Sequence, residues 1–289
     1  MAQTLSQDRL DVLRRIEQYE RLGYFDRDVE NDPPTRPLRR GEVDYVGKKW
    51  RTRLSTALAN QVARRYFDGC IARGELVIKE VRGIEHYLAV APGGAIITCN
   101  HFNAYDNYAV YKVLEPYLGK RRLYKIIREG NYTSFGGLFG FFFRHCNTLP
   151  LARDRHVFRE FKEGLSMLLA RGEKVLIYPE QGMWWNYRKP RPLKAGAFHF
   201  AATAGVPLLP FFITMEDTDR IGKDGFPIQA YTVHILPAIK PDASLSVREN
   251  AARMCDHNSR VWKETYESFY GCPLTYTTEN SKEDDTCST

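Results

Sequence analysis

The stretch Ala95-Ile-Ile-Thr-Cys-Asn-His-Phe-Asn-Ala-Tyr-Asp106 sets the pattern of the whole chain. Its apolar start predicts a buried strand, its polar middle a turn, and the apolar spacing that follows predicts a helix over 105–117. On one continuous helix His101 and Asp106 would point about 140° apart. With His101 in the turn and Asp106 in the first helical turn, the two side chains can meet.

An imidazole oriented by a carboxylate is suited to act as a general base near pH 7. The pair taken alone also fits a surface histidine near a helix N-terminus, because His-x4-Asp is a weak pattern. The interpretation therefore depends on what surrounds it.

Short apolar runs alternate with helical periodicities on both sides of this stretch. The spacing predicts strands at 75–81, 94–99, 122–127, 147–151, 174–178, 207–214 and 230–237, and helices at 105–117, 133–145, 155–171, 195–204 and 245–269. This alternation indicates an α/β fold with a largely parallel or mixed sheet flanked by helices. His101, Arg153 and Glu180 each follow a predicted strand, so we expect them at the carboxyl edge of the sheet, where reactive groups collect.

The first 73 residues differ from the rest and predict an N-terminal helical appendage. Amphipathic helices are expected at 7–22 and at 51–72, where Leu54, Leu58, Val62 and Tyr66 recur at four-residue spacing. Two alternatives stay open for these helices, a membrane-facing hairpin and a helical lid. We expect the α/β domain over 74–271 and a polar, acidic tail over 272–289 that is disordered from about residue 277.

Composition narrows the classes of function. The six cysteines form no Cys-x-x-Cys pair, which favours reduced thiols in the cytoplasm, and no metal-binding motif occurs. The net charge of +7 fits attraction to an anionic membrane surface. No nucleic-acid-binding motif accompanies that charge, and no apolar run approaches the roughly 20 residues of a membrane span.

Four blocks of sequence, in order, resemble the 1-acylglycerol-3-phosphate (lysophosphatidic acid) acyltransferase family of glycerolipid acyltransferases. They are Asn100-His101 with Asp106, Leu149-Pro-Leu-Ala-Arg153, Tyr178-Pro-Glu-Gln-Gly182 and Val206-Pro-Leu-Leu-Pro210. Each block is weak alone, whereas four in order over residues 75–215 make a fairly specific signal.

The resemblance implies a role for each matching residue. His101 would be the general base that activates the acceptor hydroxyl, with Asp106 orienting it. Asn100, Arg153, Glu180 and Gly182 would contribute to binding a phosphorylated glycerol acceptor. The family implies an acyl-CoA or acyl carrier protein co-substrate, no further cofactor, and a lysophospholipid acceptor. It also implies peripheral attachment of a cytoplasmic protein to the inner face of a membrane.

The third block departs from the family pattern, because Gln181 separates the glutamate from Gly182 and a small polar residue is missing after the glycine. The loop that follows, 186–194, holds four cations and no acid. Of these cations, Arg188 and Lys194 are candidates for an alternative phosphate site. Trp184 and Trp185 fit a lipid interface or simple packing, and Phe135–Phe143 fits an acyl-chain groove, a bilayer contact or a buried helix.

Other functions remain as rivals. A hydrolase could use Cys99, which alternates with His101, although a thiol inside an apolar strand is usually buried and inert, and no Gly-x-Ser-x-Gly elbow occurs. A sugar or polyol hydroxyl would suit the same base. The basic helices also fit a non-catalytic peripheral lipid-binding protein.

Overall fold

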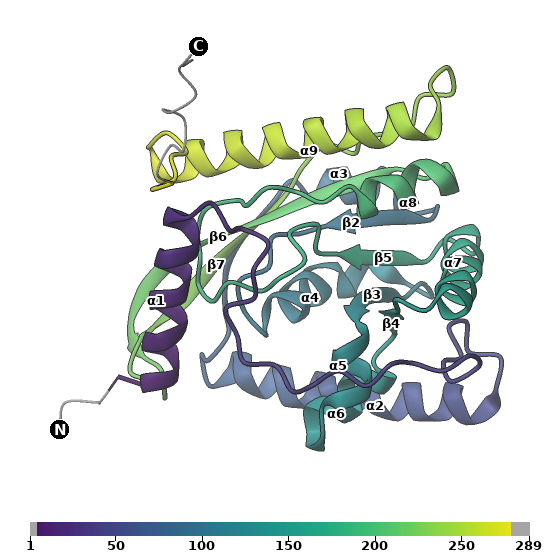
Figure 1. Ribbon diagram of the computed structural model, residues 1–289, viewed down its shortest axis with the longest axis horizontal. Helices are drawn as coiled ribbons and strands as arrows, with labels where there is room; N and C mark the ends of the chain where they lie inside the picture. The colour runs from purple at the N-terminus through teal and green to yellow at the C-terminus, as the bar shows by residue number, and fades with distance from the viewer. Residues whose placement is uncertain (1–4, 279–289) are drawn as a thin grey trace, which may run out of the picture.

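The computed structural model describes residues 5–278, and within this range a seven-stranded mixed sheet forms the centre of the molecule (Figure 1). The strands are β1 (Val77–Arg82), β2 (Ala95–Thr98), β3 (Leu123–Arg128), β4 (Thr148–Leu151), β5 (Lys174–Ile177), β6 (Leu208–Ile221) and β7 (Pro227–Ile235). Their order across the sheet is β1-β7-β6-β2-β5-β3-β4. The predicted α/β fold is confirmed.

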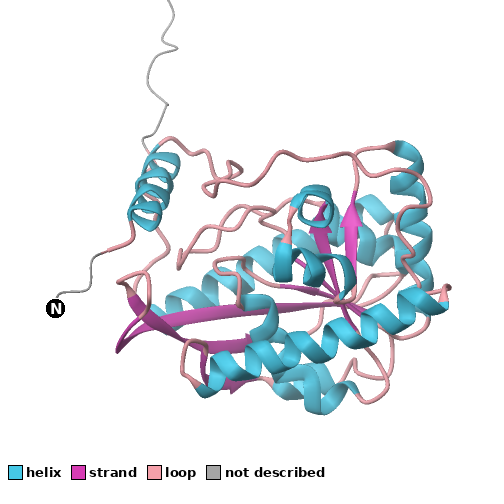
Figure 2. Ribbon diagram, turned by 90° about the horizontal axis from the view of Figure 1, so that it is seen from below, coloured by secondary structure: helices cyan, strands magenta, loops and turns pink. Residues whose placement is uncertain are grey.

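Neighbouring strands are parallel except β6 and β7, which form an antiparallel hairpin that extends beyond the rest of the sheet (Figure 2). β2 lies between β5 and β6, and all four of its residues are buried. A strand covered on both faces needs a continuous apolar run rather than an alternating one, and Ala95-Ile-Ile supplies it. The turn that carries His101 therefore leaves the carboxyl end of a central strand.

Two helical layers cover the sheet. The helices are α1 (Gln7–Arg21), α2 (Trp50–Ala72), α3 (Ile84–Leu88), α4 (Asp106–Leu118), α5 (Glu129–Ser134), α6 (Gly137–His145), α7 (Arg155–Ala170), α8 (Gly196–Ala204) and α9 (Val247–Tyr270). Buried side chains of α2, α4 and α6 form one core layer with the sheet, and those of α7, α8 and α9 form the other.

The two N-terminal helices do not form a hairpin. α1 buries Val12 and Ile16 against Trp184 and Trp185, beside the β6–β7 hairpin, whereas α2 lies along the lower side of the molecule in the view of Figure 1. Residues 22–49, the N-terminal arm, join them without regular structure. The arm passes the carboxyl edge of the sheet, where Asp28 contacts Arg128, and ends at the amino edge, near Arg122 (Figure 1). Both tryptophans are therefore packed inside the protein, not at a lipid interface.

The apolar stripe that the four-residue spacing predicted on α2 is in part exposed to solvent. Leu54 and Leu58 are 62% and 54% exposed, while Ala59, Ala63 and Phe67 are buried. Leu54 and Ala63 are nine residues apart, which places them on opposite sides of a helix at 100° per residue. The helix has two apolar faces, and the face with Ala59, Ala63 and Phe67 is the one that packs against α4 and α6.

The predicted helix over 133–145 is broken in two. Gly137, at the start of α6, has a φ of 60°, which ordinary residues rarely adopt, so the chain turns between α5 and α6. On α6, Phe142 is buried, whereas Leu138 and Phe139 are each 42% exposed. The apolar segment 135–143 is therefore partly buried in the core and partly exposed to solvent. The predicted disorder of the tail falls mainly outside the described residues.

No helix among residues 5–278 is long and apolar enough to cross a membrane. The predicted boundaries at 73/74 and 271/272 stay predictions. They bracket the sheet and its covering helices, since β1 begins at Val77 and α9 ends at Tyr270.

Candidate active site

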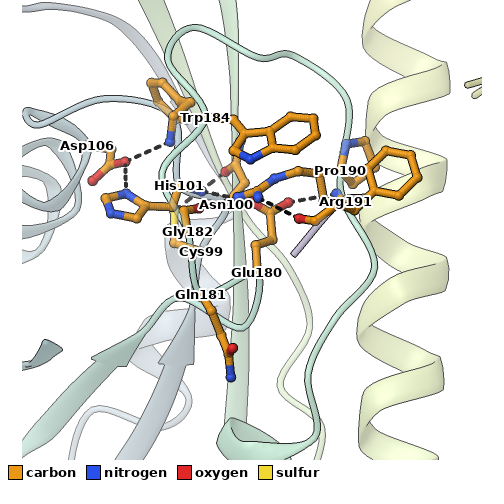
Figure 3. Close-up of polar contacts among 12 residues, drawn as sticks. Cys99, Asn100, His101, Asp106, Glu180, Gln181, Gly182, Trp184, Pro190 and Arg191 are labelled. Atoms are coloured by element: carbon orange, nitrogen blue, oxygen red, sulfur yellow. Dashed lines mark hydrogen bonds and ion pairs between the residues drawn. The ribbon is translucent and has the colours of Figure 1, made fainter. Parts of the chain in front are cut away.

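The turn after β2 brings His101 and Asp106 together, as the spacing predicted. His101 Nδ1 lies 2.7 Å from Asp106 Oδ2, and Asp106 sits at the start of α4 (Figure 3). The carboxylate is fully buried, while the His101 side chain keeps 22% of its surface exposed. Nδ1 facing a carboxylate carries the proton, which leaves the lone pair of Nε2 available. Among the described residues no hydrogen bond engages Nε2.

Asp106 is held by several donors besides the imidazole. Its Oδ2 accepts the backbone N–H groups of Phe102 at 3.1 Å and Asn103 at 3.2 Å, and its Oδ1 accepts the Tyr178 hydroxyl at 2.6 Å. The Tyr178 ring stacks on His101 at 4.0 Å between centroids. Burial and the nearby carboxylate raise the pKa of Tyr178 well above its usual value, so it remains a neutral donor. Tyr178 thus fixes both members of the pair.

Asn100 anchors the turn to the sheet. Its side-chain amide donates to the carbonyl of Ile213 at 2.9 Å and accepts the Ile213 N–H at 2.8 Å. Asn100 is buried, and both ends of its amide are used by β6. These bonds fix the backbone directly before His101, and the predicted contact of Asn100 with substrate stays a prediction.

Glu180 lies in a buried ion pair with Arg191 (Figure 3). Its Oε2 accepts from the Arg191 guanidinium at 3.1 Å and from the His101 N–H at 3.1 Å, and its Oε1 accepts the Arg191 N–H at 2.8 Å. Both side chains are at most 2% exposed. The carboxylate therefore joins residues 178–195, the site loop, to the His101 turn. Its predicted role as an acceptor ligand stays untested.

Arg191 was not singled out from the sequence. Its guanidinium also donates to the carbonyls of Phe25 and Gly182, and it lies over the Trp184 ring. In the sequence it is one of four cations in the loop that follows Glu180. Nothing in that pattern distinguishes a buried cation from a solvated one.

Two properties that one glycine could supply, a positive φ and room for close contact, are found at two neighbouring residues, Gln181 and Gly182. Gln181 has a φ of 66°, in the left-handed region that favours glycine, and its side chain points away from the His101–Asp106 pair (Figure 3). Gly182 provides close approach instead, because a Cβ there would lie 3.2 Å from Asp28 Oδ1 and 3.3 Å from Arg128 Nη2. The departure from the family pattern thus concerns the backbone of the loop.

The remaining predicted cations are spread out. Arg153 is exposed just beyond β4, three strands from β2, which corresponds to roughly 14 Å at the usual strand spacing. Arg188 pairs with Asp217 at 2.8 Å, on the β6–β7 hairpin. Lys194 lies 3.5 Å from Asp26 of the N-terminal arm. Their predicted role in phosphate binding stays a prediction.

Arg128 is a cation that the sequence reasoning missed. It ends β3, two strands from β2, and it contacts the carbonyl of Gln181 at 3.3 Å. Asp28 and Asp32 of the N-terminal arm both pair with it. The available signal was its position, directly after the strand predicted over 122–127 and therefore at the carboxyl edge of the same sheet as β2.

The environment of Cys99 argues against the hydrolase alternative, in which this thiol would be the nucleophile. The thiol is fully buried, and burial together with Asp106 and Glu180 raises its pKa well above the usual range. Its thiol donates to the side-chain oxygen Oδ1 of Asn100, with Sγ at 3.6 Å from that oxygen. Within the described part of the chain, no three His, Cys, Asp or Glu side chains are arranged to hold a metal ion.

Comparison with known proteins agrees with this geometry. Residues 79–214 match the family model described as Acyltransferase. The crystal structure of the 1-acyl-sn-glycerophosphate (LPA) acyltransferase PlsC from Thermotoga maritima is similar at a TM-score of 0.51 and 17% identity, over 93% of this chain and 98% of that one. No curated protein sequence matches significantly. Residues 79–214 therefore belong to the Acyltransferase family, which confirms the predicted acyltransferase family for that stretch, and the chain shares the fold of the solved 1-acyl-sn-glycerophosphate acyltransferase.

Proposed function

We propose that the chain is an O-acyltransferase that moves a fatty acyl group from a thioester to the free hydroxyl of a lysophospholipid. The observation that carries the proposal is His101, whose Nδ1 is held by Asp106 while Nε2 stays open. The proposed donor is acyl-CoA or acyl carrier protein. The proposed acceptor is 1-acyl-sn-glycerol-3-phosphate, in phospholipid biosynthesis, because the similar solved structure is that of a 1-acyl-sn-glycerophosphate acyltransferase.

The proposed reaction is a direct transfer. His101 Nε2 takes the proton of the acceptor hydroxyl while the oxygen bonds to the thioester carbon. The carbon–sulfur bond of the tetrahedral intermediate then breaks, and the imidazolium returns its proton to the leaving thiolate. Asp106 stabilises the imidazolium between these steps. The thioester is activated enough that no covalent acyl-enzyme is needed.

Asn100, Glu180 and Arg191 are proposed as positioning residues. Glu180 accepts the His101 N–H, and Asn100 is tied to β6 on both sides of its amide. These contacts hold the turn at a fixed place above β2. A base displaced by about 1 Å loses much of its effect, which is why rigid support matters for this reaction.

Arginines at the same edge are proposed to receive the acceptor phosphate, because a guanidinium can grip phosphate oxygens in bidentate fashion. Arg153 is exposed there, and Arg128 stands one strand closer to His101. Arg188 and Lys194 extend this basic rim along the site loop, although each has a carboxylate beside it. Gly182 lets the loop backbone pass close to Arg128.

We further propose that the protein docks on the inner face of a membrane from the cytoplasm. Trp50, Leu54 and Leu58 form an exposed apolar stripe along α2. Leu138 and Phe139 add exposed apolar surface on α6, which packs beside α2. Exposed apolar side chains on two packed helices, with Arg51 and Arg53 beside them on α2, fit a lipid interface, where apolar burial and electrostatic attraction act together.

The test is acyl transfer by the purified protein from acyl-CoA and from acyl carrier protein to lysophosphatidic acid, neutral lysolipids and a sugar panel. Replacing His101 by Ala should lower kcat at least ~10²–10⁴-fold, the contribution typical of a general base. His199→Ala is the matched control, because His199 is exposed on α8, away from the site. Equal loss in both variants, or no transfer with any pair, would overturn the proposal.

One observation favours a second acceptor class, a neutral sugar or polyol. Carboxylates of the N-terminal arm stand beside Arg128 and Lys194, where a phosphate would otherwise bind. Transfer to a neutral acceptor alone would keep the mechanism and replace lysophosphatidic acid. Lipid binding without any transfer would favour the non-catalytic alternative.

A further inference from the structure

A second basic site lies away from His101, at the amino edge of the sheet. It is a cleft of about 350 Å³ between the end of the N-terminal arm, the first turns of α2, the end of α6 and the starts of β3 and β4. His101 lies at the opposite edge, because β2, β3 and β4 run parallel in one sheet. The cleft is therefore separate from the candidate active site.

Positive charge dominates its lining. Five cations line the cleft, against two carboxylates, Glu42 and Asp44; the five are Lys49, Arg51, Arg53, Arg122 and Arg144. Glu42 is bound by Arg36, and Asp44 accepts the N–H groups of Lys48 and Lys49 at the start of α2. Both acids are thus already engaged.

The five cations have no acidic partner of their own. Within residues 5–278, no carboxylate lies in ion-pair distance of any of them. Arg144 donates to the carbonyl of Phe135 at 2.9 Å, and Arg51 lies over the Trp50 ring. The Thr56 hydroxyl lines the cleft on the α2 side, whereas the Ser55 hydroxyl already donates to the carbonyl of Thr52 at 3.0 Å. Such a set is built to receive an anion with several acceptor oxygens.

The same two turns of α2 carry the exposed apolar stripe. Trp50, Leu54 and Leu58 point to solvent, and residues 51–53, 55 and 56 line the cleft. A lipid whose chains lie along the stripe has its head group beside the cleft. Apolar surface and cations together distinguish this place from a merely basic patch.

We propose that this cleft binds the head group of an anionic phospholipid with a terminal phosphate monoester, at a membrane surface. The proposal rests on the proposed membrane docking through α2. A phosphomonoester carries more negative charge than a phosphodiester and presents three free oxygens. It therefore matches five cations offset by only two acids better than a singly charged head group does. The first-turn N–H groups of α2 add to the attraction.

The test is vesicle co-sedimentation of the full chain at matched surface charge. Phosphatidic acid supplies the monoester and phosphatidylglycerol the diester, each in phosphatidylcholine. We expect tighter binding to phosphatidic acid. Arg53→Gln with Arg122→Gln should weaken that binding roughly tenfold, because each cation near the surface contributes measurably. Both are exposed, so the fold should persist.

Lys240→Gln with Arg248→Gln is the control, since both are exposed elsewhere and the charge change is equal. Equal binding to the two lipids, no binding to either, or equal weakening by both double variants would overturn the proposal. Acyl transfer is measured separately, on acceptor dispersed in detergent, where Arg53→Gln with Arg122→Gln should match the wild type. His101→Ala should keep its preference for phosphatidic acid, so failure of the cleft and failure of the reaction are told apart.

Discussion

The two edges of the sheet differ in how their cations are partnered. At the carboxyl edge Arg191 pairs with Glu180, Arg128 with Asp28, and Lys194 lies beside Asp26. At the amino edge the five cations of the cleft have no carboxylate within ion-pair distance among the described residues. A cation that is paired within the chain must give up its carboxylate before it can bind a ligand, whereas a cation without a partner is available at once. The predictions below test this distinction.

The largest effect is expected from Glu180→Gln. The substitution keeps the size of the side chain but leaves the buried Arg191 charge without its counter-ion, which should lower the free energy of unfolding by about 3–5 kcal/mol. Urea denaturation measures it. Asp26→Asn, which removes the acid of an exposed pair, should cost at most about 1 kcal/mol. A Glu180→Gln protein of unchanged stability but raised acceptor KM would instead make Glu180 an acceptor ligand, as the sequence predicted.

Arg153→Ala is expected to act on binding rather than on stability. Arg153 is exposed at the carboxyl edge, and no contact of its guanidinium occurs within the described residues. Loss of a charge-assisted hydrogen bond to phosphate is worth about 1.5–3 kcal/mol, so acceptor KM should rise at least about tenfold while donor KM stays near its original value. Arg159→Ala, one turn into α7, is the control. An unchanged acceptor KM would remove Arg153 from the phosphate site.

The sequence was sufficient for the elements whose pattern is local. The apolar run at Ala95, the turn at His101 and the helix from Asp106 follow from periodicity and spacing, and the pair forms with the predicted geometry. The sequence also predicted that the site lies at the carboxyl edge of the sheet, because the carboxyl ends of parallel strands lie at the same edge.

What the sequence could not supply depends on long-range packing. Two apolar faces on α2 look alike in periodicity, and only the close contact with α4 and α6 selects Ala59 and Ala63 for the core. The same holds for Glu180, whose partner is eleven residues away in a loop of four equivalent cations. Nothing local predicts that the N-terminal arm places Asp28 on Arg128.

Releasing Arg128 from the N-terminal arm should have a smaller effect. In Asp28→Asn with Asp32→Asn the two exposed pairs are lost, each worth at most about 1 kcal/mol. Acceptor KM for lysophosphatidic acid should fall up to about fivefold, with no change for a neutral acceptor. Asp8→Asn with Asp11→Asn, on the outer face of α1, is the control. A rise in KM would mean that the acids of the arm themselves hold the acceptor.

The smallest expected effect is that of Gln181→Gly, and it bears on the one departure from the family pattern. A side chain at a φ of 66° costs about 1–2 kcal/mol, and the extra freedom of glycine in the unfolded chain returns about 0.5–1 kcal/mol of that. The variant should therefore be more stable by roughly 0.5 kcal/mol in urea denaturation, with acceptor KM unchanged. Gln181→Ala keeps the strained backbone and serves as the control. The Gln181 side chain points away from His101, so neither variant should change the acceptor KM. A changed KM in both variants would show that the side chain takes part in head-group recognition. Stabilisation by glycine alone would place the departure in the backbone of the site loop.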